Sequence, residues 1–259
     1  MSTNIHPTAI VSSSAELDSD VVIGPYAVVE DNVVIGQGSV INAGTYIASG
    51  SRIGKEVKVF PYAVIGSIPQ DLKFSGEETA VEIGDRTVIR EFVTINRGTK
   101  ETGKTSVGSD CLLMAYSHVA HDCVVGNNCI LANAATLAGH VTLEEWVNVG
   151  GLVPIHQFVK IGCHAMIGGG WRVPKDVPPY TTAAGSPLKP IDINKIGLKR
   201  RGFSDETISI LRKAYKILFR SKTDMKQSLA ILESLGDLGP EVEHLRNFIR
   251  SSVRGVIMY

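Results

Sequence analysis

A period of six residues runs through the first two thirds of the chain and limits what it can fold into. Aliphatic residues recur at every sixth position from Ile5 to Val173, with two interruptions. Small residues lie four positions after many of them, as at Ala27, Cys111 and Ala135. Neither the 3.6-residue period of a helix nor the two-residue alternation of a simple strand produces this spacing. The pattern predicts a three-sided prism in which each hexad forms one side and three hexads complete one coil.

The repeats resemble those of the left-handed parallel β-helix family, and the expected handedness comes from that resemblance. The hexads fail near residues 67–80 and 97–106, so we expect two loops that leave the coil. After Val177 the hexads stop, and we predict that the proline-rich stretch from there to Pro190 is a linker. The expected domains are a left-handed β-helix at 1–190 and a small C-terminal α-helical domain at 191–259, with helices near 205–220, 224–235 and 240–253.

Composition narrows the possible functions. Lys and Arg together number 26, as do Asp and Glu, so the net charge gives no sign of nucleic-acid binding. The sequence has no run of about 18 apolar residues and no signal-peptide pattern, so we expect a cytoplasmic protein without a transmembrane segment. The four cysteines lack the CxxC spacing of a zinc site, and we expect them to be small core residues: Cys111, Cys123, Cys129 and Cys163.

Four of the seven histidines are predicted to gather along one edge of the prism, because positions about 18 apart are stacked in successive coils. These are His118, His121, His140 and His156, whereas His6, His164 and His244 fall outside the cluster and are expected at the surface. Such an edge suits either a zinc hydratase of the carbonic-anhydrase type or a general base with anion-binding neighbours. A lysine-bearing loop and a basic C-terminal region favour the second chemistry.

Seven short stretches carry a resemblance over essentially the whole chain. They are QDLK at 70–73, IGDR at 83–86, HVAHDC at 118–123, LAGH at 137–140, HQF at 156–158, DVPPY at 176–180 and GLKRRGF at 197–203. Together they resemble the acyl-ACP:UDP-N-acetylglucosamine O-acyltransferases. The resemblance implies transfer of a 3-hydroxyacyl chain from acyl carrier protein to UDP-N-acetylglucosamine or its 3-amino analogue, the first step of lipid A synthesis. It also implies a homotrimer with active sites between subunits.

The same resemblance assigns roles to individual residues. His121 is the expected general base, and the backbone N–H of Gly139 is the expected oxyanion donor. Asp122 either orients His121 or, as its neighbour in the chain, points away. The expected substrate-binding residues are Gln70, Asp71, Lys73, His118, His140, His156, Gln157, Asn194, Arg200 and Arg201, and the expected acyl-chain ruler is Gly169, Gly170 and Trp171.

Two positions depart from the family pattern. Asn96 stands where the family often has histidine, and Ile196 stands where it often has glutamate. The resemblance implies that the acyl chain is attached to the phosphopantetheine of the carrier protein. Neither a further cofactor nor a metal is expected. The alternatives are a β-helix transferase that uses acetyl-CoA, the zinc hydratase, and a rigid solenoid that binds a surface through its flat faces.

Overall fold

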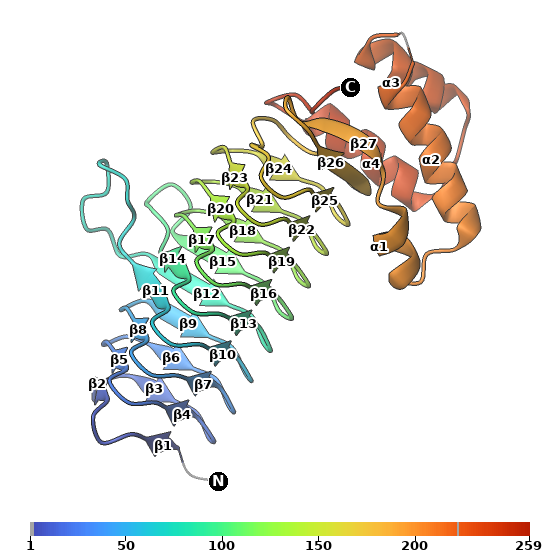
Figure 1. The fold of residues 1–259 in the computed structure, drawn as a ribbon. Coiled ribbons are helices and arrows are strands. Elements are labelled where there is room, and N and C mark those ends of the chain that lie inside the picture. Colours follow the sequence, from blue (N-terminus) through green and yellow to red (C-terminus); the bar gives the residue numbers. More distant parts are fainter. Residues whose placement is uncertain (1–2, 222) are drawn as a thin grey trace.

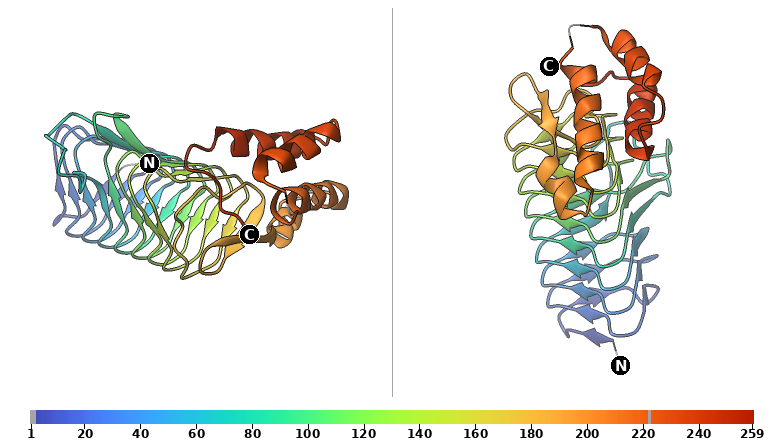
Figure 2. Two further views of the ribbon diagram at one scale, coloured as in Figure 1. Left: turned by 90° about the horizontal axis from the view of Figure 1, so that it is seen from above. Right: turned by 90° about the vertical axis from the view of Figure 1, so that its right-hand side faces the viewer.

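The computed structural model describes residues 3–221 and 223–259 and has a long three-sided prism followed by a group of helices (Figure 1). The sides of the prism are sheets of 11, 8 and 8 strands, which are parallel except for the last strand of the largest sheet. The helices lie beside the last coils, at the opposite end of the prism from the N-terminus (Figure 2). No helix in the described part of the chain is long and apolar enough to cross a bilayer.

Each strand spans only two to five residues. The first sheet contains β1 (Asn4–Ile5), β4 (Val22–Ile23), β7 (Val40–Ile41), β10 (Lys58–Val59), β13 (Val88–Ile89), β16 (Leu112–Leu113), β19 (Ile130–Leu131), β22 (Asn148–Val149), β25 (Met166–Ile167), β26 (Thr181–Ala184) and β27 (Lys189–Ile193). The second contains β2 (Ile10–Val11), β5 (Val28–Val29), β8 (Tyr46–Ile47), β11 (Val64–Ser67), β14 (Thr94–Asn96), β17 (His118–Val119), β20 (Thr136–Leu137) and β23 (Pro154–Ile155). The third contains β3 (Glu16–Leu17), β6 (Val34–Ile35), β9 (Ser51–Ile53), β12 (Ala80–Ile83), β15 (Lys104–Val107), β18 (Val124–Val125), β21 (Thr142–Leu143) and β24 (Lys160–Ile161).

The register of the sheets reproduces the predicted coil of three hexads. Val22 pairs with Val40, and Ile130 pairs with Asn148, one coil of 18 residues apart. The two longer coils contain the loops predicted near 67–80 and 97–106, which run from β11 to β12 and from β14 to β15. Both loops therefore leave the prism at the corner between the second and third sheets, and Figure 1 shows them projecting on the same side.

The aliphatic residue of each hexad fills the interior of the prism. Ile41, Leu113 and Leu131 are fully buried, and each such side chain contributes about 1.5–3 kcal/mol through removal of apolar surface from water. The small positions lie inside as well. Cys111 and Cys129 are both buried and unpaired, as expected of core residues. The sequence period thus sets the cross-section of the whole prism.

The helical region contains α1 (Lys195–Arg200), α2 (Asp205–Phe219), α3 (Met225–Ser234) and α4 (Pro240–Ser251). The last three match the helices that the sequence predicts, and the hydroxyl of Ser204 accepts the N–H of Thr207 as the expected N-cap. The short helix α1 was not predicted. Asn194 caps it, with its side-chain oxygen accepting the N–H of Gly197.

The prediction of a linker between Val177 and Pro190 is wrong. β26 extends the first sheet in parallel with β25, and β27 returns antiparallel to β26. The prolines are compatible with this hairpin because Pro187 lies between the strands and Pro190 lies in the outermost strand of its sheet, where a missing N–H is tolerated. The boundary expected at residue 190 thus falls inside β27, and the helices begin at Lys195.

Two histidines expected at the surface instead join the helical region to the prism. His164 is buried, stacked between the rings of Trp146 and Tyr180 at centroid distances of 6.2 and 5.7 Å. His244 on α4 is partly buried, and its Nε2 lies 2.7 Å from a carboxylate oxygen of Glu144 in the prism. Only His6 of the three is exposed. Sequence spacing could not predict that the helical region covers His164 or that His244 pairs with Glu144, because the hexads do not determine where the helices lie.

The ion pair between His244 and Glu144 predicts a pH-dependent contribution to stability. Contacts with Cys163 and with Glu144 raise the pKa of His244 to about 10, compared with about 6.5 in an unfolded chain. A raised folded-state pKa means that this contribution is complete below pH 6.5 and is lost as the pH rises through about 10. We expect the difference in melting temperature between the wild type and His244→Gln to be larger at pH 6 than at pH 10.5. An equal difference at both pH values would contradict this.

Candidate active site

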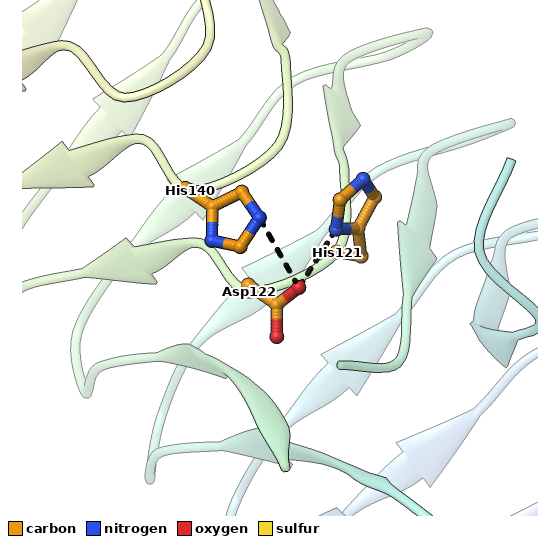
Figure 3. A group of neighbouring side chains, drawn as sticks. All are labelled: His121, Asp122 and His140. Carbon is orange, nitrogen blue, oxygen red and sulfur yellow. Dashed lines mark hydrogen bonds and ion pairs between the residues drawn. The ribbon is translucent and has the colours of Figure 1, made fainter. Parts of the chain in front are cut away.

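A histidine and a carboxylate form a close pair at the corner between the second and third sheets. His121 and Asp122 lie in the turn between β17 and β18, and Nδ1 of His121 is 2.7 Å from Oδ2 of Asp122 (Figure 3). Asp122 therefore points toward His121, which resolves the alternative that the sequence left open. Because an ionised carboxylate only accepts hydrogen bonds, Nδ1 carries a proton, and whenever the ring is neutral Nε2 presents its lone pair.

Asp122 is buried but remains ionised. Burial by itself would raise the pKa of this carboxyl, but hydrogen bonds from Thr102, His121 and Thr99 outweigh burial and lower the pKa to about 2. Its backbone lies in the left-handed region, at a φ of 60°, which is uncommon outside glycine but better tolerated by aspartate than by most residues. The carboxylate is thus a fixed negative charge beside the imidazole.

The next two coils add further side chains at the same corner. His140 follows β20, and its ring meets that of His121 edge-on at 5.2 Å and stacks on Phe158 at 4.5 Å. Nε2 of His140 lies 3.4 Å from Glu101 and 3.6 Å from Asp122, between two carboxylates. We call the turns that contain His121–Asp122, Gly139–His140 and Gln157–Phe158 the histidine corner.

Gly139 lies directly against the free side of the His121 ring. A Cβ built on Gly139 would lie 2.7 Å from Nε2 and 2.6 Å from Cε1 of His121, so only glycine fits there without displacing the ring. Its backbone N–H has no hydrogen-bond partner within residues 3–221 and 223–259. A free amide beside a basic nitrogen can bind a negative oxygen that forms next to that base.

A groove of about 520 Å³ brings the histidine corner together with the loop at residues 67–80. It is lined by Gln70, Asp71, Leu72, Lys73, Glu101, His121, His140, Gln157 and Phe158. Six of these were predicted from the sequence as site residues, whereas Leu72, Glu101 and Phe158 were not. Glu101 lies in the second loop, whose path the hexads do not determine.

His118 lies in the second sheet and His156 directly follows β23 of the same sheet, but neither lines the groove. His118 is in β17, with its Nδ1 atom 2.7 Å from the hydroxyl of Thr94. Burial lowers the pKa of His118, and the nearby charge of His121 lowers it further. Nδ1 of His156 lies 3.1 Å from the backbone oxygen of Gln157.

The remaining predicted site residues lie at other corners of the prism. Asn194 donates to the carbonyl of His164 at 2.9 Å, while Arg201 stacks over Trp146 at 5.0 Å and contacts Nδ1 of His164. Arg200 is exposed. These groups gather between the third and first sheets. The predicted ruler, Gly169, Gly170 and Trp171, follows β25 at the corner between the first and second sheets, and all three of its residues are exposed.

The two departures from the family pattern have different positions. Asn96 is buried at the end of β14, and its amide donates to the hydroxyl of Ser67 at 2.9 Å and the carbonyl of Ile68 at 3.0 Å. It therefore anchors the start of the loop that carries Lys73. Ile196 is exposed on α1, and nothing in the described structure explains an isoleucine at this position.

The hexapeptide prism and the histidine–carboxylate pair beside a free amide define the class of protein: this is an acyltransferase with a left-handed parallel β-helix. Residues 14–49 and 104–139 match the family described as bacterial transferase hexapeptide (six repeats). Residues 176–257 match the family described as UDP N-acetylglucosamine O-acyltransferase, domain 2.

Full-length relatives give the family. The acyl-[acyl-carrier-protein]–UDP-N-acetylglucosamine O-acyltransferases of Paracidovorax citrulli and Herminiimonas arsenicoxydans are 52% and 48% identical to the chain, each over 98% of both proteins. The structure of the UDP-N-acetylglucosamine acyltransferase from Bacteroides fragilis superposes with a TM-score of 0.96 at 45% identity, covering 98% of this chain and 99% of that one. The chain therefore belongs to the UDP-N-acetylglucosamine O-acyltransferase family, which confirms the predicted family and fold class.

Proposed function

We propose that this protein transfers a 3-hydroxyacyl chain from acyl carrier protein to the 3-position of UDP-N-acetylglucosamine or its 3-amino analogue, the first step of lipid A synthesis. The observation that carries the proposal is the His121–Asp122 pair facing the free amide of Gly139 in a groove. The family membership supplies the substrates. An acetyl-CoA-dependent transferase is disfavoured because the full-length relatives bear names that specify acyl carrier protein.

In the proposed reaction Nε2 of His121 takes the proton of the attacking hydroxyl or amine as its oxygen or nitrogen bonds to the thioester carbonyl carbon. The carbonyl oxygen becomes an oxyanion that accepts the N–H of Gly139. When the intermediate collapses, the carbon–sulfur bond breaks and the phosphopantetheine thiolate takes the proton back from His121. Asp122 stabilises the imidazolium between these steps because it stays ionised.

Lys73 and its neighbours are proposed to bind the acceptor. The loop at residues 67–80 brings Gln70, Asp71 and Lys73 to the groove that His121 and His140 line. An ammonium group there can neutralise a phosphate, and the amide and carboxylate can bind sugar hydroxyls. His118 and His156 are proposed to contact the acceptor at the margins of the same site, and Gln157 to contact it within the groove.

A homotrimer is proposed because one prism separates the parts of the site. The histidine corner, the Asn194–Arg201 group and the Gly169–Trp171 ruler lie at three different corners, so neighbouring copies must adjoin to combine them. The ruler corner also exposes a column of large apolar side chains: Tyr26, Tyr62, Phe92, Tyr116 and Leu152. Exposed apolar stripes mark interaction surfaces. Sedimentation should give three times the chain mass, and a fully active monomer would contradict the proposal.

No metal and no further cofactor are part of the proposed chemistry. Atoms of His121, Asp122 and His140 lie within 4.8 Å of one another, close enough for a zinc site. However, Nδ1 of His121 is occupied by Asp122, whose oxygens also accept hydrogen bonds from Thr99 and Thr102. Zinc would have to break these bonds.

The four free, buried cysteines support the proposed cytoplasmic location, because thiols persist in a reducing compartment.

Product analysis tests the function. Purified protein is incubated with 3-hydroxyacyl carrier protein and either UDP-N-acetylglucosamine or its 3-amino analogue, and mass spectrometry identifies the product. We expect an ester with the first acceptor or an amide with the second, at a rate that a chelator does not change. Acylation only from acetyl-CoA, or loss of activity with the chelator, would contradict the proposal.

The ruler is proposed to act through free space at Gly169, and this gives a prediction. A Cβ at Gly169 meets only the carbonyl oxygen of Gly151 at 3.1 Å and its N at 3.6 Å, so a larger side chain projects outward from the prism. Gly169→Met should therefore shorten the preferred acyl chain by filling the end of the acyl groove between subunits. Competition among carrier proteins loaded with different chain lengths measures the preference. An unchanged preference would remove Gly169 from the ruler.

A further inference from the structure

The loop at residues 97–103, between β14 and β15, surrounds the carboxylate of Asp122 with hydrogen-bond donors. Oδ1 of Asp122 accepts the N–H of Thr99 at 2.9 Å and the hydroxyl of Thr102, while Oδ2 accepts the hydroxyl of Thr99 at 2.8 Å. The remaining strong contact of Oδ2 is Nδ1 of His121 at 2.7 Å. Among the residues that the structure describes, one loop, at residues 97–103, therefore supplies every donor to this carboxylate except the imidazoles.

We propose that Thr99 and Thr102 are positioning residues for acyl transfer, holding Asp122 so that it accepts the Nδ1 proton of His121 and leaves Nε2 free as the base. The inference rests on the proposed function of His121. Neither threonine lines the groove with the histidines, and each acts through Asp122. This gives the loop a function in the reaction beyond closing one side of the site.

Geometry explains why the threonines are needed. His140 Nε2 lies 3.6 Å from the same Oδ2 atom, so a carboxylate free to rotate has a competing donor. The hydroxyl of Thr102 has a single proton and lies 2.9 Å from the carbonyl of Lys104 as well, but a charged carboxylate is the stronger acceptor. The backbone of Asp122 is fixed separately, because its N–H donates to the hydroxyl of buried Thr105 at 2.8 Å. The threonines thus control the remaining freedom, which is rotation of the carboxylate.

The charges around His121 determine the direction of the expected pH effect. The titratable groups that face this site are Asp71, Lys73, Glu101, His118, Asp122 and His140. Removing a hydroxyl donor leaves more of the negative charge of Asp122 for the imidazolium form of His121. The protonated, inactive form then persists to higher pH. The acidic limb of the pH–rate profile should therefore move upward in pH.

Thr102→Val tests the inference because valine keeps the shape of threonine without its hydroxyl. A hydrogen bond to a charged group is worth about 1.5–3 kcal/mol, so we expect kcat/KM to fall by about 10- to 100-fold and the acidic limb to move to higher pH. Thr102→Ser should restore both. Thr136→Val is the matched control, since the one hydrogen bond of that hydroxyl within the described residues goes to the carbonyl of Ala134 at 3.2 Å, and it should change neither quantity.

A spectroscopic readout separates this inference from the proposed function. In ¹⁵N-histidine-labelled protein the His121 signal, assigned by its loss in His121→Ala, should report the Nδ1–H tautomer in the wild type and a mixture of tautomers in Thr102→Val. A single unchanged tautomer with kcat/KM within about twofold of the wild type would overturn the inference. If the tautomer changes but no acyl transfer is found in any variant, the positioning role stands and the proposed function is wrong.

Discussion

Replacing His121 with alanine is expected to lower kcat by about 10²- to 10⁴-fold, the usual contribution of a general base. The loss should appear at saturating substrate, because Lys73 and the other groove residues that are proposed to bind the acceptor remain in place. The fold should survive the change. Asp122 keeps its hydrogen bonds to Thr99 and Thr102, so the substitution leaves no bare buried charge.

The control for His121→Ala is His6→Ala, which removes an exposed histidine far along the prism from the groove. Both variants should melt within a few degrees of the wild type. Retention of more than about a tenth of wild-type kcat in His121→Ala would show that the base lies elsewhere. His140 is then the next candidate, because its Nε2 also lies near the Asp122 carboxylate.

Much of this architecture could be predicted from sequence because a β-helix is governed by a local period. The aliphatic and small positions fix the coil, and stacking of one coil on the next places His121 and His140 at one corner without knowledge of any long-range contact. The three longer helices were predicted for the same reason, since their caps and apolar faces are local features.

What the sequence did not predict depends on contacts outside the period. The second loop turns back so that Thr99, Glu101 and Thr102 reach Asp122 and His140, and no repeat specifies that path. The burial of His164 depends on how the helical region docks on the prism. The hairpin of β26 and β27 was missed because its prolines resemble those of a linker, although both fit an outer strand and its turn.

Gly139→Ala is expected to reduce kcat by at least about 10²-fold, although it adds only one methyl group. The new Cβ would lie 2.7 Å from Nε2 of His121, closer than real Cβ contacts, so the imidazole must swing away from it and from Asp122. The methyl group itself also crowds the space beside the Gly139 N–H and keeps the reacting carbonyl away from it, and loss of one oxyanion donor alone costs about 10²- to 10³-fold. Gly139 has no left-handed φ, so its backbone accepts alanine.

Gly151→Ala is the matched control for folding, because Gly151 occupies the corresponding place in a turn at the ruler corner, where a Cβ meets the carbonyl oxygen of Asn133 at 3.3 Å. Its melting temperature should stay near that of the wild type. Combining Gly139→Ala with His121→Ala then separates the two causes. If the methyl group acts only by displacing the imidazole, it should have no further effect once the imidazole is gone. If the Gly139 N–H also binds the oxyanion, the double variant should be slower than His121→Ala alone. Activity of Gly139→Ala close to that of the wild type would contradict both roles.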